Sequence, residues 1–154
     1  MIDQKYTIPR WMSLIYRCGQ MYIGERLKNY EIGKGQHIFL NALYKEDGLS
    51  QEELSSYLRI DKGTTAKALK KLEALGYVTR QVRDEDRRSY RVFLTDKALG
   101  IKDQVRGVLM DWRHILTYGF TEEEKESALQ LLERMGSNVT RFIEDGTAQD
   151  LTKD

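Results

Sequence analysis

The hydrophobic pattern changes its period at Gly76, and this change constrains the fold more than any other feature. Upstream, apolar residues recur at helical spacing, at Ala68 or Leu69, Leu72 and Leu75. Downstream, alternate positions follow the two-residue period of half-buried antiparallel strands, namely Val78, Arg80 and Val82 and then Tyr90, Val92 and Leu94. A glycine just past a helix end tolerates the left-handed backbone found there. The pattern therefore predicts a helix that runs directly into a β-hairpin.

Two helix starts precede this point. Ser50 and Glu53 have the spacing of a capping box, in which each side chain bonds a backbone N–H of the other's turn. Asp61 is a suitable N-cap for the helix that ends at Gly76. Two helices joined by a turn of about three to four residues are typical of a helix-turn-helix. With the hairpin, residues 50–76 and 77–95 are predicted to form a winged helix-turn-helix.

Apolar residues also recur at helical spacing on both sides of this region, before residue 50 and after residue 95. One helix is expected within residues 8–30 and a shorter one after Gly35. Thr95 is expected to cap a long helix that continues through Leu116, and Thr121 and Glu124 form another capping box before a final helix. The predicted fold is mainly α (α+β). We expect an N-terminal helix (1–32), a winged helix-turn-helix region (33–95), C-terminal helices (96–145) and a frayed tail (146–154).

Composition excludes several functional classes. No apolar run reaches the ~20 residues that a membrane span needs. The N-terminus lacks a signal-peptide pattern, and one cysteine allows no internal disulfide, so we expect a cytoplasmic protein. We find no nucleophile–base pair, phosphate-binding glycine loop or carboxylate cluster, so we expect neither an enzyme nor a cofactor. The two histidines, His37 and His114, lie in no metal-ligand pattern.

Positive charge is concentrated in the middle of the chain, although the net charge is only +1. Residues 59–91 hold ten Lys/Arg and five Asp/Glu. Local charge on a compact element governs binding to polyanions more than the charge of the whole chain. The second helix of a helix-turn-helix fits the major groove of DNA. Its small residues (63–66) would allow close approach, and Lys67, Lys70 and Lys71 would neutralise phosphates.

The predicted hairpin tip, residues 83–91, contains four arginines and three acids. A hairpin beside a groove-reading helix lies over the neighbouring minor groove, which attracts inserted arginine. Arg87 and Arg88 can supply that arginine, Asp86 can orient Arg88 through a charge-assisted bond, and Asp84 can cap the turn. The alternative is an exposed salt-bridge cluster, which would contribute only ~0–1 kcal/mol per pair.

Taken together, these segments resemble the MarR family of transcription regulators. The resemblance is carried by residues 49–54, 61–67 and 72–80 and by the run Asp84-Glu85-Asp86-Arg87-Arg88 followed by Leu94-Thr95. It implies a homodimeric regulator, usually a repressor, with a pseudo-palindromic double-stranded DNA operator. The DNA contacts predicted on this basis are Ser50, Gln51, Lys62, Gly63, Thr64, Thr65, Lys67, Lys70, Lys71, Arg83, Asp86, Arg87 and Arg88.

The resemblance also implies a possible effector, because many members bind small aromatic or phenolic anions between the dimer helices and the winged domain. The side chains that could line such a cleft are Trp11, Tyr16, Arg17, His37 and Trp112. Each has an alternative role as core or interface filler. Cys18 is the one candidate for redox sensing, although a lone cysteine on an apolar stripe more often packs as a small hydrophobe. A protein-interaction module using the basic face is the other alternative.

Overall fold

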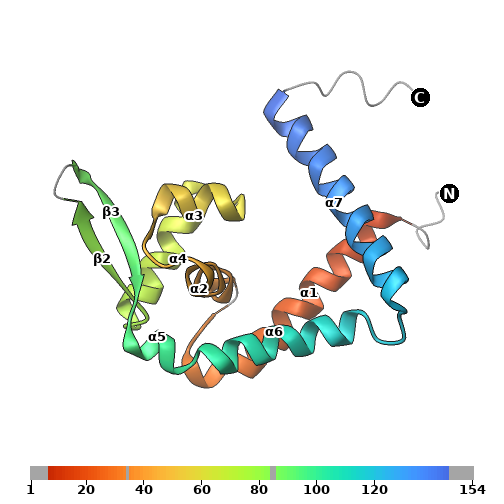
Figure 1. Cartoon of the computed structure of the whole chain (residues 1–154), viewed down its shortest axis with the longest axis horizontal. Coiled ribbons are helices and arrows are strands. Elements are labelled where there is room, and N and C mark those ends of the chain that lie inside the picture. The colour runs from red at the N-terminus through yellow and green to blue at the C-terminus, as the bar shows by residue number, and fades with distance from the viewer. Residues whose placement is uncertain (1–6, 34, 84–85, 146–154) are drawn as a thin grey trace. The chain divides into compact units, whose positions relative to one another are not determined.

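The computed structural model describes residues 7–33, 35–83 and 86–145, and for residues 83 and 86–89 it describes the backbone alone. The chain divides into two compact units, one up to Arg113 and one from His114 onward. The first contains α1 (Ile8–Leu27), η2 (Lys28–Tyr30), α2 (Gln36–Lys45), β1 (Leu49–Ser50), α3 (Gln51–Leu58), α4 (Lys62–Ala74), β2 (Val78–Arg83), β3 (Asp86–Leu94), α5 (Asp96–Gly100) and most of α6 (Lys102–Leu116) (Figure 1). The second contains α7 (Glu122–Asp145). This order confirms the predicted mainly helical, winged helix-turn-helix fold. No helix among the described residues is long and apolar enough to cross a membrane.

The core of the first unit holds the helix-turn-helix against α2 and the sheet. Leu54 of α3, Leu69 and Leu72 of α4 and Val92 of β3 are all fully buried. Phe39 and Leu40 of α2 belong to the same buried cluster. Fully burying such side chains contributes about 1.5–3 kcal/mol each. The orientation of α4 is therefore set by its inner apolar face, which leaves the opposite face to solvent.

The sheet contains a third strand that the hydrophobic pattern did not predict. The strand order is β1-β3-β2, and both pairs are antiparallel. β1 is only two residues long, and Leu49 pairs with Val92. A segment so short carries no detectable alternation, and its pairing partner lies more than forty residues further along the sequence. This pairing joins the start of α3 to the hairpin.

The hairpin is longer than predicted and its connection is shorter. Arg83 pairs with Asp86, so the strands continue to within two residues of each other. Most of the segment expected to be a charged loop is therefore strand β3. Backbone hydrogen bonds form the ladder and need no apolar side chains, so an exposed hairpin can extend beyond its hydrophobic residues. Val82, expected to be half-buried, is 62% exposed.

The helix expected to run from Thr95 to Leu116 is interrupted. Thr95 caps α5 as predicted, since its hydroxyl accepts a bond from the Ala98 N–H. However, α5 ends at Gly100, and α6 begins only at Lys102. The Ala98 carbonyl accepts from the Tyr44 hydroxyl at 2.6 Å and from the Ile101 N–H at 3.3 Å, which is a tighter turn than the four-residue spacing of an α-helix. Glycine at position 100 also lowers helix propensity.

Candidate nucleic-acid interface

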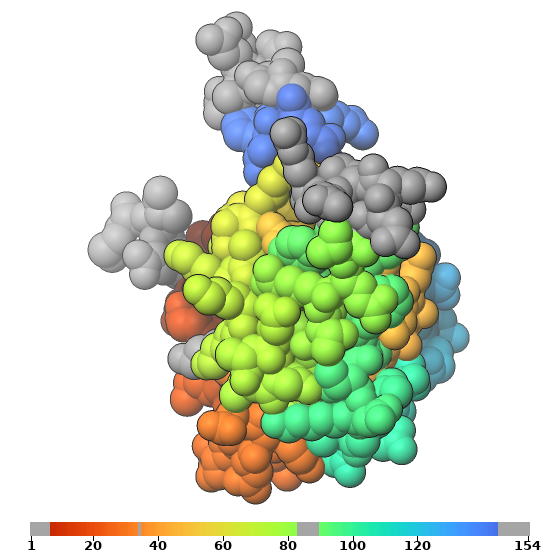
Figure 2. Space-filling model, turned by 90° about the vertical axis from the view of Figure 1, so that its left-hand side faces the viewer, coloured from red at the N-terminus to blue at the C-terminus, as the bar shows by residue number. Residues whose placement is uncertain are grey.

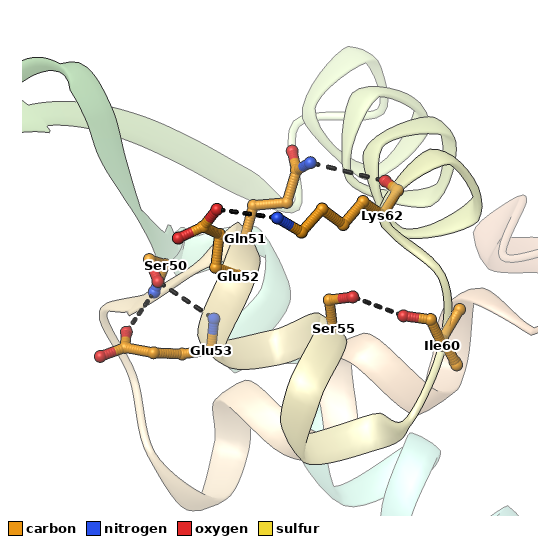
Figure 3. A network of polar contacts seen from close by, with 7 residues as sticks. All are labelled: Ser50, Gln51, Glu52, Glu53, Ser55, Ile60 and Lys62. Atoms are coloured by element: carbon orange, nitrogen blue, oxygen red, sulfur yellow. Dashed lines mark hydrogen bonds and ion pairs between the residues drawn. The ribbon is translucent and has the colours of Figure 1, made fainter. Parts of the chain in front are cut away.

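Local polar contacts hold the start of α3 and the turn between α3 and α4 (Figure 3). Ser50 and Glu53 form the predicted capping box: the Glu53 N–H donates to Ser50 Oγ at 3.1 Å, and the Ser50 N–H donates to Glu53 Oε2 at 2.7 Å. The Ser55 hydroxyl donates to the Ile60 carbonyl at 2.5 Å. These bonds satisfy backbone groups at the start of α3 and in the turn that follows it. The partners in these bonds are only three to five residues apart, so the local sequence is enough to specify them.

Asp61 caps α4 as predicted. Its Oδ1 accepts from the Thr64 N–H at 2.8 Å, and its Oδ2 accepts from the Thr64 hydroxyl at 2.6 Å. These bonds lower the pKa of the Asp61 carboxyl below its usual value. The carboxylate is thus ionised at neutral pH and sits at the positive end of the helix.

The outer face of α4 is basic and exposed. Lys67, Lys70 and Lys71 are all exposed, as are Gly63 and Thr64 near the start of the helix. Lys62 is also exposed, but its Nζ lies 3.1 Å from Glu52 Oε1. Such an exposed pair contributes little to stability, so Lys62 can exchange Glu52 for a phosphate at small cost. In Figure 2 the residues of α4 (yellow to lime) lie beside those of β2 (lime to green).

Thr65 is an exception among the predicted DNA contacts. Its side chain is fully buried, and its hydroxyl has no hydrogen-bond partner among the described residues. Thr65 lies one turn before Leu69, and positions four apart share one helix face. The inner apolar face of α4 therefore includes Thr65, which cannot reach DNA in this conformation. The prediction for this residue is wrong.

Gln51 links the wing to the turn. The Tyr90 hydroxyl donates to Gln51 Oε1, and Gln51 Nε2 lies 3.5 Å from the Lys62 carbonyl. The amide therefore joins β3 to the first residue of α4. In this structure Gln51 connects the wing to α4, and its expected contact with DNA remains a prediction.

Arg91 and Asp47 anchor the base of the hairpin, and the sequence offered no signal for either role. Arg91 Nη1 donates to the Gly48 carbonyl at 2.5 Å and lies 3.9 Å from Glu53 Oε2. Asp47 Oδ1 accepts from the N–H groups of Gly48 and Leu94 at 3.0 Å and 2.9 Å. The bonds from Arg91 to Gly48 and from Leu94 to Asp47 each join residues more than forty positions apart, so no local pattern could reveal them.

The predicted wing contacts lie largely outside the described residues. The side chains of Arg83, Asp86, Arg87 and Arg88 belong to that group, and so does all of Asp84. The backbone places Asp86, Arg87 and Arg88 in strand β3. Their proposed contacts with DNA, and the expected bond between Asp86 and Arg88, remain predictions.

A cavity of about 340 Å³ lies between α1, α2 and α4, and Tyr16 is one of the residues that line it. The other four candidates for an effector site are not among them. Trp11 is 52% exposed, Arg17 donates to Ser13 Oγ at 2.6 Å, and burial lowers the pKa of His37. The ring of Trp112 packs against Tyr22, with centroids 5.7 Å apart. The structure thus does not bring the five together.

Fold and surface define the class of the protein. A capped helix with an exposed basic face, preceded by a short helix and followed by a two-stranded wing, is a winged helix-turn-helix. Similarity to known proteins specifies the class further. The sequence pattern of the MarR family matches residues 32–89.

Solved structures cover more of the chain. A MarR transcriptional regulator from Methanosarcina mazei Go1 is 45% identical, with a TM-score of 0.80 over 88% of this chain and 97% of that one. A MarR protein from Peptoclostridium difficile DA00132 is 32% identical, with a TM-score of 0.85 over 90% and 91%. The MepR–DNA complex of S. aureus shares the fold at 23% identity, with a TM-score of 0.81 over 86% and 98%. This chain belongs to the MarR family of transcription regulators.

Proposed function

We propose that this regulator binds double-stranded DNA as a homodimer and represses transcription until a small ligand releases it. The observation that carries the proposal is the exposed basic face of α4, whose inner face is fixed in the core. An α-helix fits the major groove of B-DNA, and its N-terminal residues approach the base edges. MepR, which shares this fold, is bound to DNA in its structure. A protein that binds chromosomal DNA must be in the same compartment as that DNA, which agrees with the cytoplasmic location expected from the sequence.

Exposed apolar residues in both units support the homodimer. On α1, Ile8, Trp11, Met12 and Ile15 are each at least 45% exposed. On α7, Leu131, Leu132, Val139 and Ile143 are more than half exposed. Contiguous exposed apolar patches are rare on monomeric proteins and mark interaction sites. We assign dimerisation to residues 1–32 and 96–145. A two-fold dimer would require a pseudo-palindromic operator with half-sites about one helical turn apart.

Release by a ligand is supported by the cavity beside α4. Thr64 and Ala68 of α4 both line it, and Thr64 belongs to the turn that would enter the groove. A molecule bound there would contact the DNA-reading helix directly. A ligand that fits the cavity in only one position of α4 would shift the population of that position.

Substitution of Lys67 and Arg88 tests the DNA assignment. The operator is first obtained by selection from random duplex DNA with the purified protein. A shared palindrome would favour DNA over an acidic protein as the partner. In a gel-shift titration at matched salt, Lys67→Ala is expected to weaken binding to all sequences and to reduce the salt slope by about 1, because one phosphate contact is lost. Arg88→Ala is expected to cost about 1–3 kcal/mol of binding free energy.

Arg134→Ala is the matched control, since Arg134 is an exposed cation on α7. It removes one positive charge without touching the helix-turn-helix. If Lys67→Ala and Arg88→Ala both bind the operator as tightly as the control does, neither α4 nor the wing reads the DNA.

A further inference from the structure

A chain of side-chain contacts leaves α4 near its end and returns to its start by way of the wing. Glu73 lies in the last turn of α4, and its Oε2 is 3.1 Å from Nε of Arg80 on β2. The guanidinium carbon of Arg80 lies 4.6 Å from the ring centroid of Tyr90 on β3, which is a cation–π contact. The Tyr90 hydroxyl donates to Gln51 Oε1, and Gln51 Nε2 lies 3.5 Å from the carbonyl of Lys62, the first residue of α4 (Figure 3). Both ends of α4 are therefore joined to the hairpin through Tyr90.

The register of the hairpin brings the two middle members of this chain together. Tyr90 pairs with Val82, and Arg80 lies two positions before Val82 on the same strand. Positions two apart on a strand face the same side of the sheet, so Arg80 and Tyr90 are diagonal neighbours on one face. Arg80 Nε is inaccessible to solvent and makes no aligned hydrogen bond within the described part of the chain. Because this nitrogen cannot turn to water instead, the Glu73 carboxylate and the Tyr90 ring both hold Arg80 in place.

Tyr90 is the described side chain of β3 that lies nearest the hairpin tip. The contacts of Arg91 and Asp47 hold the base of the hairpin. A strand rises about 3.3 Å per residue, so Asp86 lies about 20 Å beyond Val92. A tilt of about 15° at the base would move the tip by about 5 Å, which is close to the ~6 Å width of the minor groove. A contact at Tyr90, two residues closer to the tip than Val92, would restrict this tilt.

We propose that Tyr90 is a positioning residue, which fixes the angle of the wing relative to α4 so that the tip meets the minor groove beside the major groove that α4 enters. This inference rests on the proposed function, because it requires that α4 and the wing both bind DNA. The DNA contact proposed for Arg88 then depends on Tyr90, since a misplaced tip cannot reach its groove. The contacts of α4 do not depend on Tyr90, because the inner face of that helix is fixed in the core.

A double-mutant cycle tests this dependence, with the affinity of the full-length protein for its selected operator measured by fluorescence anisotropy. In the wild type, Arg88→Ala is expected to weaken binding about 5-fold to 150-fold. In the Tyr90→Leu background, the same substitution is expected to weaken binding less than about twofold, because the tip no longer reaches its groove. A tyrosine that only contacted DNA itself, or only stabilised the fold, would leave the two losses multiplicative.

Two phenylalanine variants complete the cycle. Tyr90→Phe removes the hydroxyl and keeps the ring beneath Arg80, so it is expected to reduce the effect of Arg88→Ala at least about twofold without abolishing it. This variant preserves the size of the ring and keeps the test valid if Tyr90→Leu does not fold. Tyr22→Phe is the matched control, because Tyr22 is also half-buried beneath an arginine, Arg26, but lies on α1. It is expected to leave the full effect of Arg88→Ala.

Dimethyl sulfate reports on both grooves at once, because it methylates guanine N7 in the major groove and adenine N3 in the minor groove. At saturating protein, Tyr90→Leu is expected to keep the protection of guanine N7 and to lose that of adenine N3. Retention of both protections, or loss of both together, would overturn the positioning role. If Arg88→Ala has no effect in the wild type, the proposed DNA contact itself fails. If it has its full effect in both backgrounds, only the role of Tyr90 fails.

Discussion

Leu132→Glu combined with Val139→Glu is expected to convert the protein from a dimer to a monomer and to weaken operator binding by about a hundredfold or more. The two residues lie two helical turns apart on one face of α7, and they are 54% and 58% exposed in the single chain. Burying two carboxylates in an apolar interface is costly. A monomer also loses the increase in affinity, about 10²-fold to 10⁴-fold, that a dimer obtains by binding two linked half-sites. Sedimentation velocity and an anisotropy titration measure the two effects.

The matched control adds the same two charges to the opposite face of α7. Gln130→Glu combined with Ser137→Glu has the same spacing, and both positions are exposed. This control is expected to remain dimeric and to lose little affinity, which separates interface disruption from general repulsion of DNA. A Leu132/Val139 variant that still sediments as a dimer would show that α7 is not the interface.

Gly48→Ala is expected to destabilise the protein by about 2–5 kcal/mol and to weaken the attachment of the wing. Gly48 has a φ of +79°, and an added Cβ would lie 2.7 Å from Phe93 Cε1. Left-handed backbone costs a non-glycine residue about 1–2 kcal/mol, and overpacking typically adds about 1–3 kcal/mol. The Gly48 N–H also donates to the Val92 carbonyl at 3.0 Å, so a shift of this backbone would disturb the sheet. Urea denaturation measures the free energy of unfolding.

Gly35→Ala is the control for backbone strain alone. Gly35 belongs to the same compact unit and has a φ of +81°, but an added Cβ would meet nothing within 4 Å. It is expected to cost only about 1–2 kcal/mol. Equal losses of stability in the two variants would mean that Phe93 moves aside freely. In that case steric contact at Gly48 would not hold the wing.

The prediction of local structure succeeded where contacts span only a few residues. Ser50, Asp61, Thr95 and Thr121 all cap helices as predicted; for example, the Glu124 N–H donates to Thr121 Oγ1 at 3.2 Å. Each cap is a bond between residues three apart, so the sequence order already brings its two partners together. The same reasoning explains why the basic face of α4 was predictable, since helical period alone separates Lys67 from Leu69.

The prediction of the site was wrong where a residue could lie on either the inner or the outer face of a helix. Thr65 adjoins Thr64 in sequence, yet one is buried and the other exposed. Polarity suggested that both would face DNA, but the packing of α4 against α3 decided otherwise. The cavity shows the same limit. Four of the five aromatic or charged candidates for an effector site do not line it.

By itself, the sequence determined the helix starts, the hairpin, the basic helix and the family, because these depend on residue type and on contacts within one or two turns. Tertiary structure decided the pairing of β1 with β3, the contact of Tyr44 with the backbone of α5, and the composition of the cavity. Each of these joins atoms from segments far apart in the chain, such as the Tyr44 hydroxyl and the Ala98 carbonyl. Such pairs form only after the core has brought the segments together.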